Sequence, residues 1–223
     1  MNKHGDFIWY ELMTSDADAA QRFYGAMLEW SFASGGISDM DYRIINAPEH
    51  AVGGLMPISP EMAEQGARPG WLGYIGVDDV DKCIESIVHG GGTVHMPATD
   101  IPGVGRFALV ADPQGAPFYI MRGASDEVSM AFAADRPRIG HCAWNELITS
   151  DQAAALHFYG VRFGWVKDGE MDMGPMGSYD FLRHGVMMGA MMKASGEMGP
   201  PHWNFYFRVI DIDKAVLFGF VAL

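Results

Sequence analysis

The 223-residue chain contains one sequence segment twice. Trp9-Tyr10-Glu11-Leu12-Met13-Thr14-Ser15-Asp16 returns as Trp144-Asn145-Glu146-Leu147-Ile148-Thr149-Ser150-Asp151. The same register carries Phe23-Tyr24-Gly25 to Phe158-Tyr159-Gly160 and Trp30 to Trp165. Identical positions over this span indicate a tandem duplication of one folding module. We therefore predict a first domain at 1–122, a linker at 123–137 and a second domain at 138–223.

The first copy begins with a predicted strand and helix. Phe7–Thr14 alternates with period two, which predicts a strand with Trp9 and Glu11 on one face. Ser15 is predicted to cap the helix that follows, with Asp16 in its first turn. Strands near 30–33, 42–46 and 51–57 complete a βαβββ unit.

A second βαβββ unit follows in the first copy. We predict a strand at 71–77, a helix from about 79, and strands near 93–97, 106–111 and 117–121. Gly90-Gly91-Gly92 follows the helix, so it is interpreted as a helix end rather than a phosphate-binding loop. Asp112-Pro113-Gln114-Gly115 is predicted to form the turn between the last two strands.

The second copy repeats this order but ends early. We predict a strand at 143–148, a helix at 150–163, and strands at 179–183, 186–192 and 203–209. The tail after Val216 is apolar on all sides, which favours a truncated or frame-shifted end that lacks the last three strands; a natural shortened domain is the alternative. The open sheet edge is then expected to be closed by the first domain, by a second chain in a homodimer, or by aggregation.

Composition narrows the classes of function. Apolar residues make up 49% of the chain and charged residues 19%, as in globular proteins, and no apolar run approaches the roughly 18 residues of a membrane span. The start of the chain lacks the apolar core of a signal peptide, so we expect a cytoplasmic protein. A net charge of −13 without a basic cluster argues against nucleic acid as a partner. Two cysteines provide neither a disulfide framework nor a thiolate metal site.

The paired modules resemble the vicinal oxygen chelate superfamily, which includes glyoxalase I, extradiol dioxygenases, fosfomycin-resistance enzymes and bleomycin-binding proteins. The resemblance rests on Asp16, Phe23-Tyr24, Trp30 and Asp112-Pro113-Gln114-Gly115 in this order, and covers residues 5–122 and 140 to about 216. It implies an α+β fold in which paired βαβββ modules form a curved, cup-shaped mixed sheet. It leaves activity open, because this fold carries metalloenzymes and metal-free binding proteins.

The resemblance also implies where a catalytic metal would be bound. The ligand positions of the family fall at Trp9, Gly54, Leu72 and Tyr119 in the first copy, and at Trp144, Gly189 and Asn204 in the second. None of these residues is a usual metal ligand, whereas a catalytic divalent metal needs about three His, carboxylate or thiolate ligands. We therefore expect no metal cofactor.

Two carboxylates are the candidate catalytic groups. Strand alternation turns Glu11 and Glu146 to the same side as the tryptophan that precedes each of them. Each is either a substrate-orienting acceptor or general base, or a structural carboxylate bound to backbone N–H groups or to an arginine such as Arg43. His141 and His202 could form an offset metal site with Glu146, but their strand registers disagree, and we expect them to be solvated.

These observations favour a small-molecule-binding protein that works without a metal and takes a mainly apolar or aromatic ligand. The predicted lining of the first cup is Trp9, Met13, Gly54, Met56, Leu72, Tyr74 and Tyr119. The Trp9 indole is expected to fill the metal position, with Gly54 leaving room for it, and Trp144 with Gly189 is expected to repeat this arrangement. One alternative is a lyase or an oxygenase-like hydroxylase with Glu11 as general base. Another is a resistance protein that sequesters a cationic drug, as the acidic charge allows.

Overall fold

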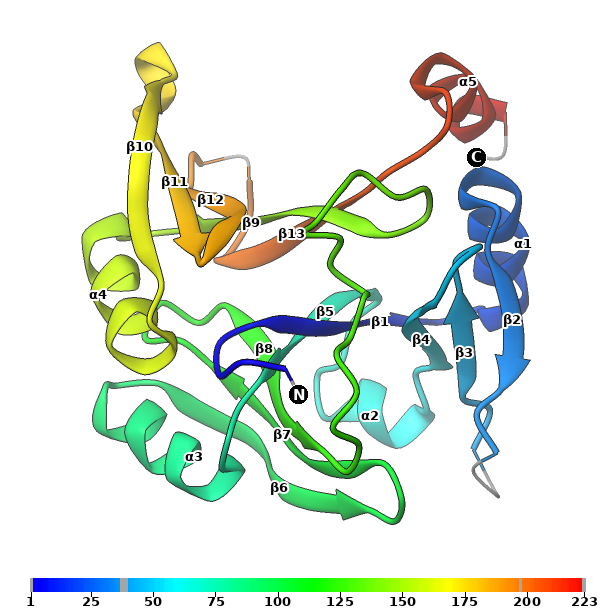
Figure 1. Ribbon diagram of the computed structural model, residues 1–223, viewed down its shortest axis with the longest axis horizontal. Coiled ribbons are helices and arrows are strands. Elements are labelled where there is room, and N and C mark those ends of the chain that lie inside the picture. The colour runs from blue at the N-terminus through cyan, green and yellow to red at the C-terminus, as the bar shows by residue number, and fades with distance from the viewer. Residues whose placement is uncertain (1, 37–39, 197, 222–223) are drawn as a thin grey trace. The chain divides into compact units, whose positions relative to one another are not determined.

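The structure is a computed structural model that describes residues 2–36, 40–196 and 198–221, with the backbone alone for Phe220 and Val221. The elements of the first copy are β1 (Phe7–Thr14), α1 (Ala17–Leu28), β2 (Ser31–Ser34), β3 (Arg43–Asn46), β4 (Ala51–Pro57), α2 (Pro60–Glu64), β5 (Gly70–Gly76), α3 (Val80–His89), β6 (Thr93–Ile101), β7 (Gly105–Ala111) and β8 (Pro117–Gly123). The elements of the second copy are β9 (Cys142–Thr149), α4 (Gln152–Phe163), β10 (Val166–Asp172), the 3₁₀ turn η1 (Gly174–Met176), β11 (Ser178–His184), β12 (Val186–Lys193), β13 (His202–Phe207) and α5 (Ile212–Val221) (Figure 1). The predicted apolar tail lies partly outside the described residues.

The predicted α+β class and the duplicated βαβββ order are confirmed. The strand β10 was not predicted, because all of its residues are exposed and no apolar face marks it in the sequence. The expected cap at Ser15 is wrong. Asp16 is the N-cap of α1, since its backbone is extended and its carboxylate accepts from the Ala19 N–H. Asp151 caps α4 in the same way.

The strands form two mixed sheets. One has the order β2-β3-β4-β1-β5-β8-β7-β6, and the other has the order β10-β11-β12-β9-β13. Within each complete βαβββ unit, the first and last strands are parallel neighbours, as in the pairs β1–β4, β5–β8 and β9–β12. Residues of a first strand therefore lie beside the residues of a fourth strand. No helix in the described part of the chain has both the length and the apolar character needed to cross a membrane.

The chain divides into two compact units, and each combines segments of both sequence copies. Unit 1 contains the residues through Ile8, Gly73–Val128 and Trp144–Phe205. Unit 2 contains Trp9–Leu72, Ser129–Ala143 and the chain from Tyr206 onward. The compact units do not follow the boundaries of the sequence repeat, because duplication and compactness are different properties. The domain limits 1–122, 123–137 and 138–223 therefore stay predictions.

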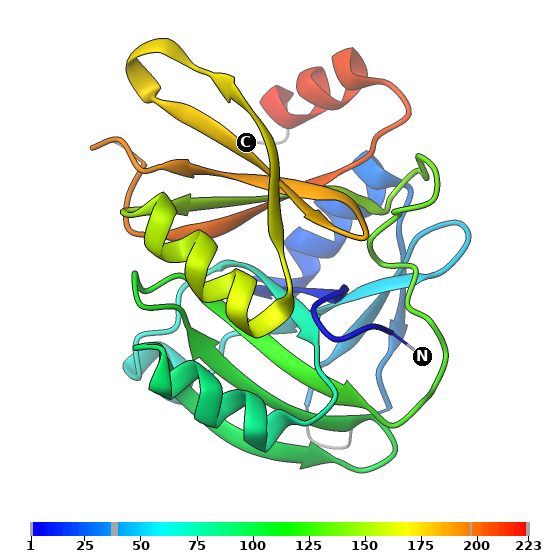
Figure 2. The same cartoon turned by 60° about the vertical axis from the view of Figure 1, so that its left-hand side comes forward.

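In unit 1, the predicted Asp112 turn is bound to an aromatic core. Tyr159 stacks on Trp165 with ring centroids 4.9 Å apart and donates its hydroxyl hydrogen to Asp112 Oδ2 at 3.0 Å. The other carboxylate oxygen of Asp112 accepts two backbone N–H groups of its own turn. Burial raises the pKa of Asp112 against the lowering effect of these bonds. The helices α3 and α4 lie side by side in this unit (Figure 2), where Arg162 donates to the Ser86 carbonyl at 2.9 Å.

In unit 2, a second aromatic core surrounds Trp30. Its ring centroid lies 5.0 Å from that of Phe207 and 5.9 Å from that of Tyr24. Trp71 donates its indole N–H to the Tyr24 hydroxyl at 3.1 Å. The edge-to-face and stacked geometries within this core add specific attraction to the area that the rings bury.

A reciprocal pair of hydrogen bonds links the two copies within each unit. Trp30 donates its indole N–H to the carbonyl of Gly140 at 2.8 Å, within unit 2. Its repeat, Trp165, donates to the carbonyl of Gly5 at 2.9 Å, within unit 1. Each tryptophan thus binds the glycine that precedes the first strand of the other copy. Both glycines have positive φ, 97° at Gly5 and 74° at Gly140, a conformation that other residues rarely adopt.

Candidate functional site

The first candidate site is a hydrogen-bonded cluster of three side chains in unit 2. Alternation along β1 places Trp9 and Glu11 on one face, and Tyr42 comes directly before β3. The Trp9 indole N–H donates to the Tyr42 hydroxyl oxygen at 3.1 Å, and that hydroxyl donates to Glu11 Oε2 at 3.1 Å. Glu11 is 3% exposed, whereas the two aromatic side chains are half-buried. Glu11 is thus buried and accepts a hydrogen bond from a protein donor.

Tyr42, and not the Trp9 indole, fills the space in front of Gly54. A Cβ on residue 54 would lie 2.0 Å from the Tyr42 hydroxyl oxygen and 2.4 Å from its Cζ. The register explains this position, because Gly54 pairs with Ile44 on β3, two residues after Tyr42. The expectation that Gly54 leaves room for the indole is therefore wrong. The absent side chain makes room for a phenol ring.

The second copy repeats the cluster in unit 1. The Trp144 indole N–H donates to the Tyr179 hydroxyl at 2.8 Å, and the hydroxyl donates to Glu146 Oε2 at 2.6 Å. Glu146 is 8% exposed, and both aromatic side chains are again half-buried. The side-chain amide of Asn204 adds a donor to Glu146 Oε1 at 3.2 Å. The two clusters therefore share one order of donor and acceptor.

The predicted correspondence of Gly189 with Gly54 is wrong by one residue. On β12, Gly189 pairs with Asn145, and Ala190 pairs with Glu146. In the first copy, by contrast, Gly54 pairs with Glu11. A Cβ on Gly189 would meet the Asn145 backbone oxygen at 1.8 Å, so this glycine permits close approach of two strands and does not accommodate Tyr179.

The remaining predicted lining residues of the first cup fall into two groups, one in each unit. In unit 2, Met13 is buried and pairs with Met56 across β1 and β4, while Met56 and Leu72 are half-buried. In unit 1, Tyr74 and Tyr119 pair across β5 and β8, and their rings stack with centroids 4.3 Å apart. Their assignment to one ligand-binding surface stays a prediction.

The alternative partners considered for the carboxylates and histidines have other contacts. Arg43 binds Asp18 and Asp41 at 2.8 and 2.7 Å and donates to Gln21. His141 is 0% exposed, so the expectation that it is solvated is wrong. His202 lies 2.8 Å from the Pro200 carbonyl through Nδ1.

The residues at the predicted metal-ligand positions of the first copy are not usual metal ligands. An indole, a glycine, a leucine and a phenol offer no strong donor set for a divalent ion. Among residues 2–36, 40–196 and 198–221, no three His, Cys, Asp or Glu side chains gather closely enough to hold one. The clusters present a different chemistry. In each of them the tyrosine hydroxyl accepts a hydrogen bond from an indole N–H and donates one to a carboxylate.

Sequence reasoning missed Tyr42 and Tyr179. At the sequence offset that relates Trp9 to Trp144, Tyr42 corresponds to position 177. Tyr179 lies two residues further along the chain, so the repeat does not align the two tyrosines. A signal was present nonetheless. Tyr42 follows Asp41 directly before β3, and Tyr179 precedes Asp180 within β11. These two strands are the ones that pair with the fourth strands of their modules, β4 and β12.

The chain is similar in sequence to proteins of one superfamily. Residues 7–120 match the family model described as "Glyoxalase/Bleomycin resistance protein/Dioxygenase superfamily". A Mycobacterium tuberculosis protein named "Putative glyoxylase CFP32" is 32% identical over 212 residues, covering 92% of this chain and 77% of that protein. "Anthracycline biosynthesis protein DnrV" of Streptomyces peucetius is 29% identical over 227 residues, covering 93% of this chain and 78% of that protein.

Solved structures of low identity share the fold. The Mn(II)-bound glyoxalase from Novosphingobium aromaticivorans has a TM-score of 0.63 and 16% identity, covering 98% of this chain and 70% of its own. The 2,2',3-trihydroxybiphenyl 1,2-dioxygenase from Sphingomonas wittichii strain RW1 has a TM-score of 0.61 and 13% identity, covering 100% of this chain and 78% of its own. At these identities the likeness concerns the fold alone.

Proposed function

The chain belongs to the Glyoxalase/Bleomycin resistance protein/Dioxygenase superfamily, and from this premise we propose that it binds a small, mainly apolar or aromatic molecule without a metal ion. The proposal concerns the sheet face that carries Trp9 and Glu11, and its repeat at Trp144 and Glu146.

One observation carries the metal-free part of the proposal. The Tyr42 hydroxyl stands 2.0 Å from the place where a side chain at position 54 would begin. A ligating side chain at that position and Tyr42 in its present place exclude each other, because real Cβ atoms do not approach other atoms so closely. The neighbouring ligand position holds Trp9, whose indole N–H is a donor and not an electron-pair ligand.

The exposure of the clusters supports an aromatic ligand. Glu11 is buried, whereas Trp9 and Tyr42 are only half-buried and keep part of their aromatic surface accessible. Aromatic rings bury a large area on contact with another ring and favour stacked or edge-to-face geometry. A relative is named for anthracycline biosynthesis, and anthracyclines are polycyclic aromatic compounds.

Two measurements test the proposal on protein purified without an affinity tag. Elemental analysis is expected to find no stoichiometric transition metal. A thermal-shift screen of polycyclic quinones, smaller phenols and bleomycin is expected to find a compound that stabilises the protein by about 2.7 kcal/mol at one hundred times its dissociation constant. Trp9→Ala is expected to reduce that shift and Trp9→Ala/Trp144→Ala to abolish it, whereas exposed Val88→Ala on α3 is the control that keeps it. A stoichiometric metal, or a screen in which no compound stabilises the chain, contradicts the proposal.

A metal-free enzyme of this superfamily is the second candidate. It is favoured by the Tyr42 hydroxyl that donates to the buried Glu11 carboxylate, because such a pair can take up a proton from a bound substrate. Glu11→Gln keeps an acceptor for Tyr42 and removes the base. If the protein is an enzyme, this variant should bind a ligand found in the screen but fail to turn it over. If the protein is a binder, wild type and variant should both leave that ligand chemically unchanged.

A further inference from the structure

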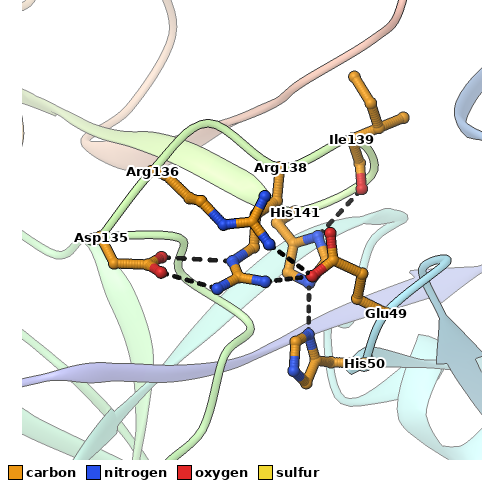
Figure 3. Close-up of polar contacts among 7 residues, drawn as sticks. All are labelled: Glu49, His50, Asp135, Arg136, Arg138, Ile139 and His141. Carbon is orange, nitrogen blue, oxygen red and sulfur yellow. Dashed lines mark hydrogen bonds and ion pairs between the residues drawn. The ribbon is translucent and has the colours of Figure 1, made fainter.

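The chain between the two copies is bound to the loop between β3 and β4 by a polar cluster in unit 2 (Figure 3). We call residues 129–141 the connector. Glu49 accepts from Arg136 at 2.9 Å and also from Arg138. Arg138 binds Asp135 through a second pair of hydrogen bonds, at 2.7 and 3.2 Å. Two guanidinium groups thus face two carboxylates, and their charges balance.

A histidine pair lies beside these ion pairs. His141 Nδ1 lies 2.9 Å from the Ile139 carbonyl oxygen, which can only accept, so Nδ1 carries the hydrogen. His141 Nε2 therefore presents a lone pair when the ring is neutral. It lies 3.2 Å from His50 Nδ1, which must donate to it (Figure 3). The protein thus determines the tautomer of both rings.

The number of protons on the pair decides whether this contact holds. When one hydrogen lies between the two facing nitrogens, the rings share a hydrogen bond. One extra proton on the outer nitrogen of half-buried His50 leaves this bond intact. When both rings are charged, each facing nitrogen carries a hydrogen, and two like charges stand 3.2 Å apart. The contact then becomes repulsive.

We propose that His50 and His141 form an acid-sensitive latch, which holds the connector to the β3–β4 loop at neutral pH and releases it when both rings are protonated. Burial lowers the pKa of the His141 ring, and the charges of His50 and Arg138 act in the same direction, against the raising effects of the Ile139 hydrogen bond and of Glu49. The latch is therefore closed at neutral pH. Release is expected below the ordinary histidine pKa of about 6.5.

The other charged groups around His141 cannot give this pH dependence. Arg138 holds the pKa of Asp135 at about 2, far below the range of histidine titration. Arg136 and Arg138 stay charged throughout. Glu49 forms partly exposed ion pairs with these arginines. Salt screens such pairs, and they contribute little to stability. Arg208, beyond β13, meets His141 through backbone groups, which do not titrate.

The latch also bears on the candidate site of the first copy. The loop that holds Glu49 and His50 joins β3 to β4. Tyr42 directly precedes β3, and Gly54 lies on β4. Release of this loop is expected to loosen the hairpin that sets the phenol ring over the glycine. The latch itself does not depend on the proposed function.

Amide hydrogen exchange of the whole protein, followed by mass spectrometry, tests the latch. After correction for intrinsic rates, exchange of connector peptides is expected to rise by about fivefold or more between about pH 7.5 and about pH 5.5. Peptides from β7 and β8 serve as the internal reference and should not change. The double variant His50→Gln/His141→Gln replaces the pair with amides that donate and accept without titrating, and should remove the rise. The control variant His89→Gln/His157→Gln, at two exposed histidines, should retain it.

Two results would overturn the latch. One is connector exchange that is the same at both pH values in the wild type. The other is a rise that the amide variant retains. If that variant does not fold, proton NMR of the histidine rings in the wild type decides: the midpoint of connector release must coincide with a histidine titration, and a midpoint near about pH 4, where carboxylates titrate, refutes the proposal.

Discussion

Gly54→Ala is the substitution for which the structure gives the sharpest expectation. The new Cβ would lie 2.0 Å from the Tyr42 hydroxyl oxygen, whereas carbon makes ordinary contacts at about 3.5–4.0 Å. The ring must therefore move by about 1.5 Å or more. This movement breaks both 3.1 Å hydrogen bonds of Tyr42, to Trp9 and to Glu11. Overpacking and the loss of a bond to a buried carboxylate together are expected to lower the free energy of unfolding by roughly 2–4 kcal/mol.

The assay is urea denaturation with a thermal melt as a second readout, in which this loss corresponds to a fall in Tm of roughly 5–15 °C. A double-mutant cycle isolates the cause. In a Tyr42→Ala background the space is open, and Gly54→Ala should be neutral or stabilise by up to about 1 kcal/mol through the entropy of the unfolded chain. Gly70→Ala, where a Cβ meets no atom within 4 Å, is the matched control and should stay within about 0.5 kcal/mol of wild type. An equal loss in both backgrounds would refute the steric reasoning.

Three further outcomes follow from named contacts. Trp30→Phe and Trp165→Phe each leave a buried carbonyl without its donor, so each should cost about 1–3 kcal/mol in urea denaturation; a near-neutral result at either position would show that its bond is dispensable. Asn204→Leu removes one donor from Glu146 and should cost about 1–2 kcal/mol, and Asn204→Asp, which brings two carboxylates together, should cost more; the reverse order would contradict the assigned hydrogen bond. The pKa of His141 is lowered on folding, so its contribution to stability is complete above the unfolded value of about 6.5 and is lost as the pH falls through the folded value. Melting curves of His141→Gln should lack this part of the pH dependence, and an unchanged profile would exclude His141 as its source.

Local sequence pattern was sufficient for most of the elements. Alternation along residues 7–14 predicted β1, and the spacing of apolar residues after Asp79 predicted α3, because half-buried strands and helices repeat every 2 and about 3.6 residues. The pattern failed at β10, whose residues are all exposed. It also placed the cap of α1 one residue early, since Ser15 and Asp16 are both good N-caps and only the backbone conformation distinguishes them.

The candidate site was predictable in part. Trp9, Glu11 and their repeats could be found because duplication and strand alternation are properties of the sequence alone. Tyr42 could not be found in this way. Its hydroxyl reaches Glu11 across a distance of 31 residues in the chain, and the register between β3 and β4 that sets it over Gly54 contains an irregularity. One residue of register shift likewise separates Gly189 from the true counterpart of Gly54.

The sequence by itself determined the family, the duplicated βαβββ order and the residue types that argue against a metal at the usual positions, because these depend on identity and period along one chain. The tertiary structure alone decided which groups meet. It brought together each Trp–Tyr–Glu cluster and the rings of His50 and His141. It also formed the hydrogen bonds from Trp30 to Gly140 and from Trp165 to Gly5. Such contacts join residues that are far apart in the chain, and they form wherever packing and buried polar groups are satisfied together, which no local pattern encodes.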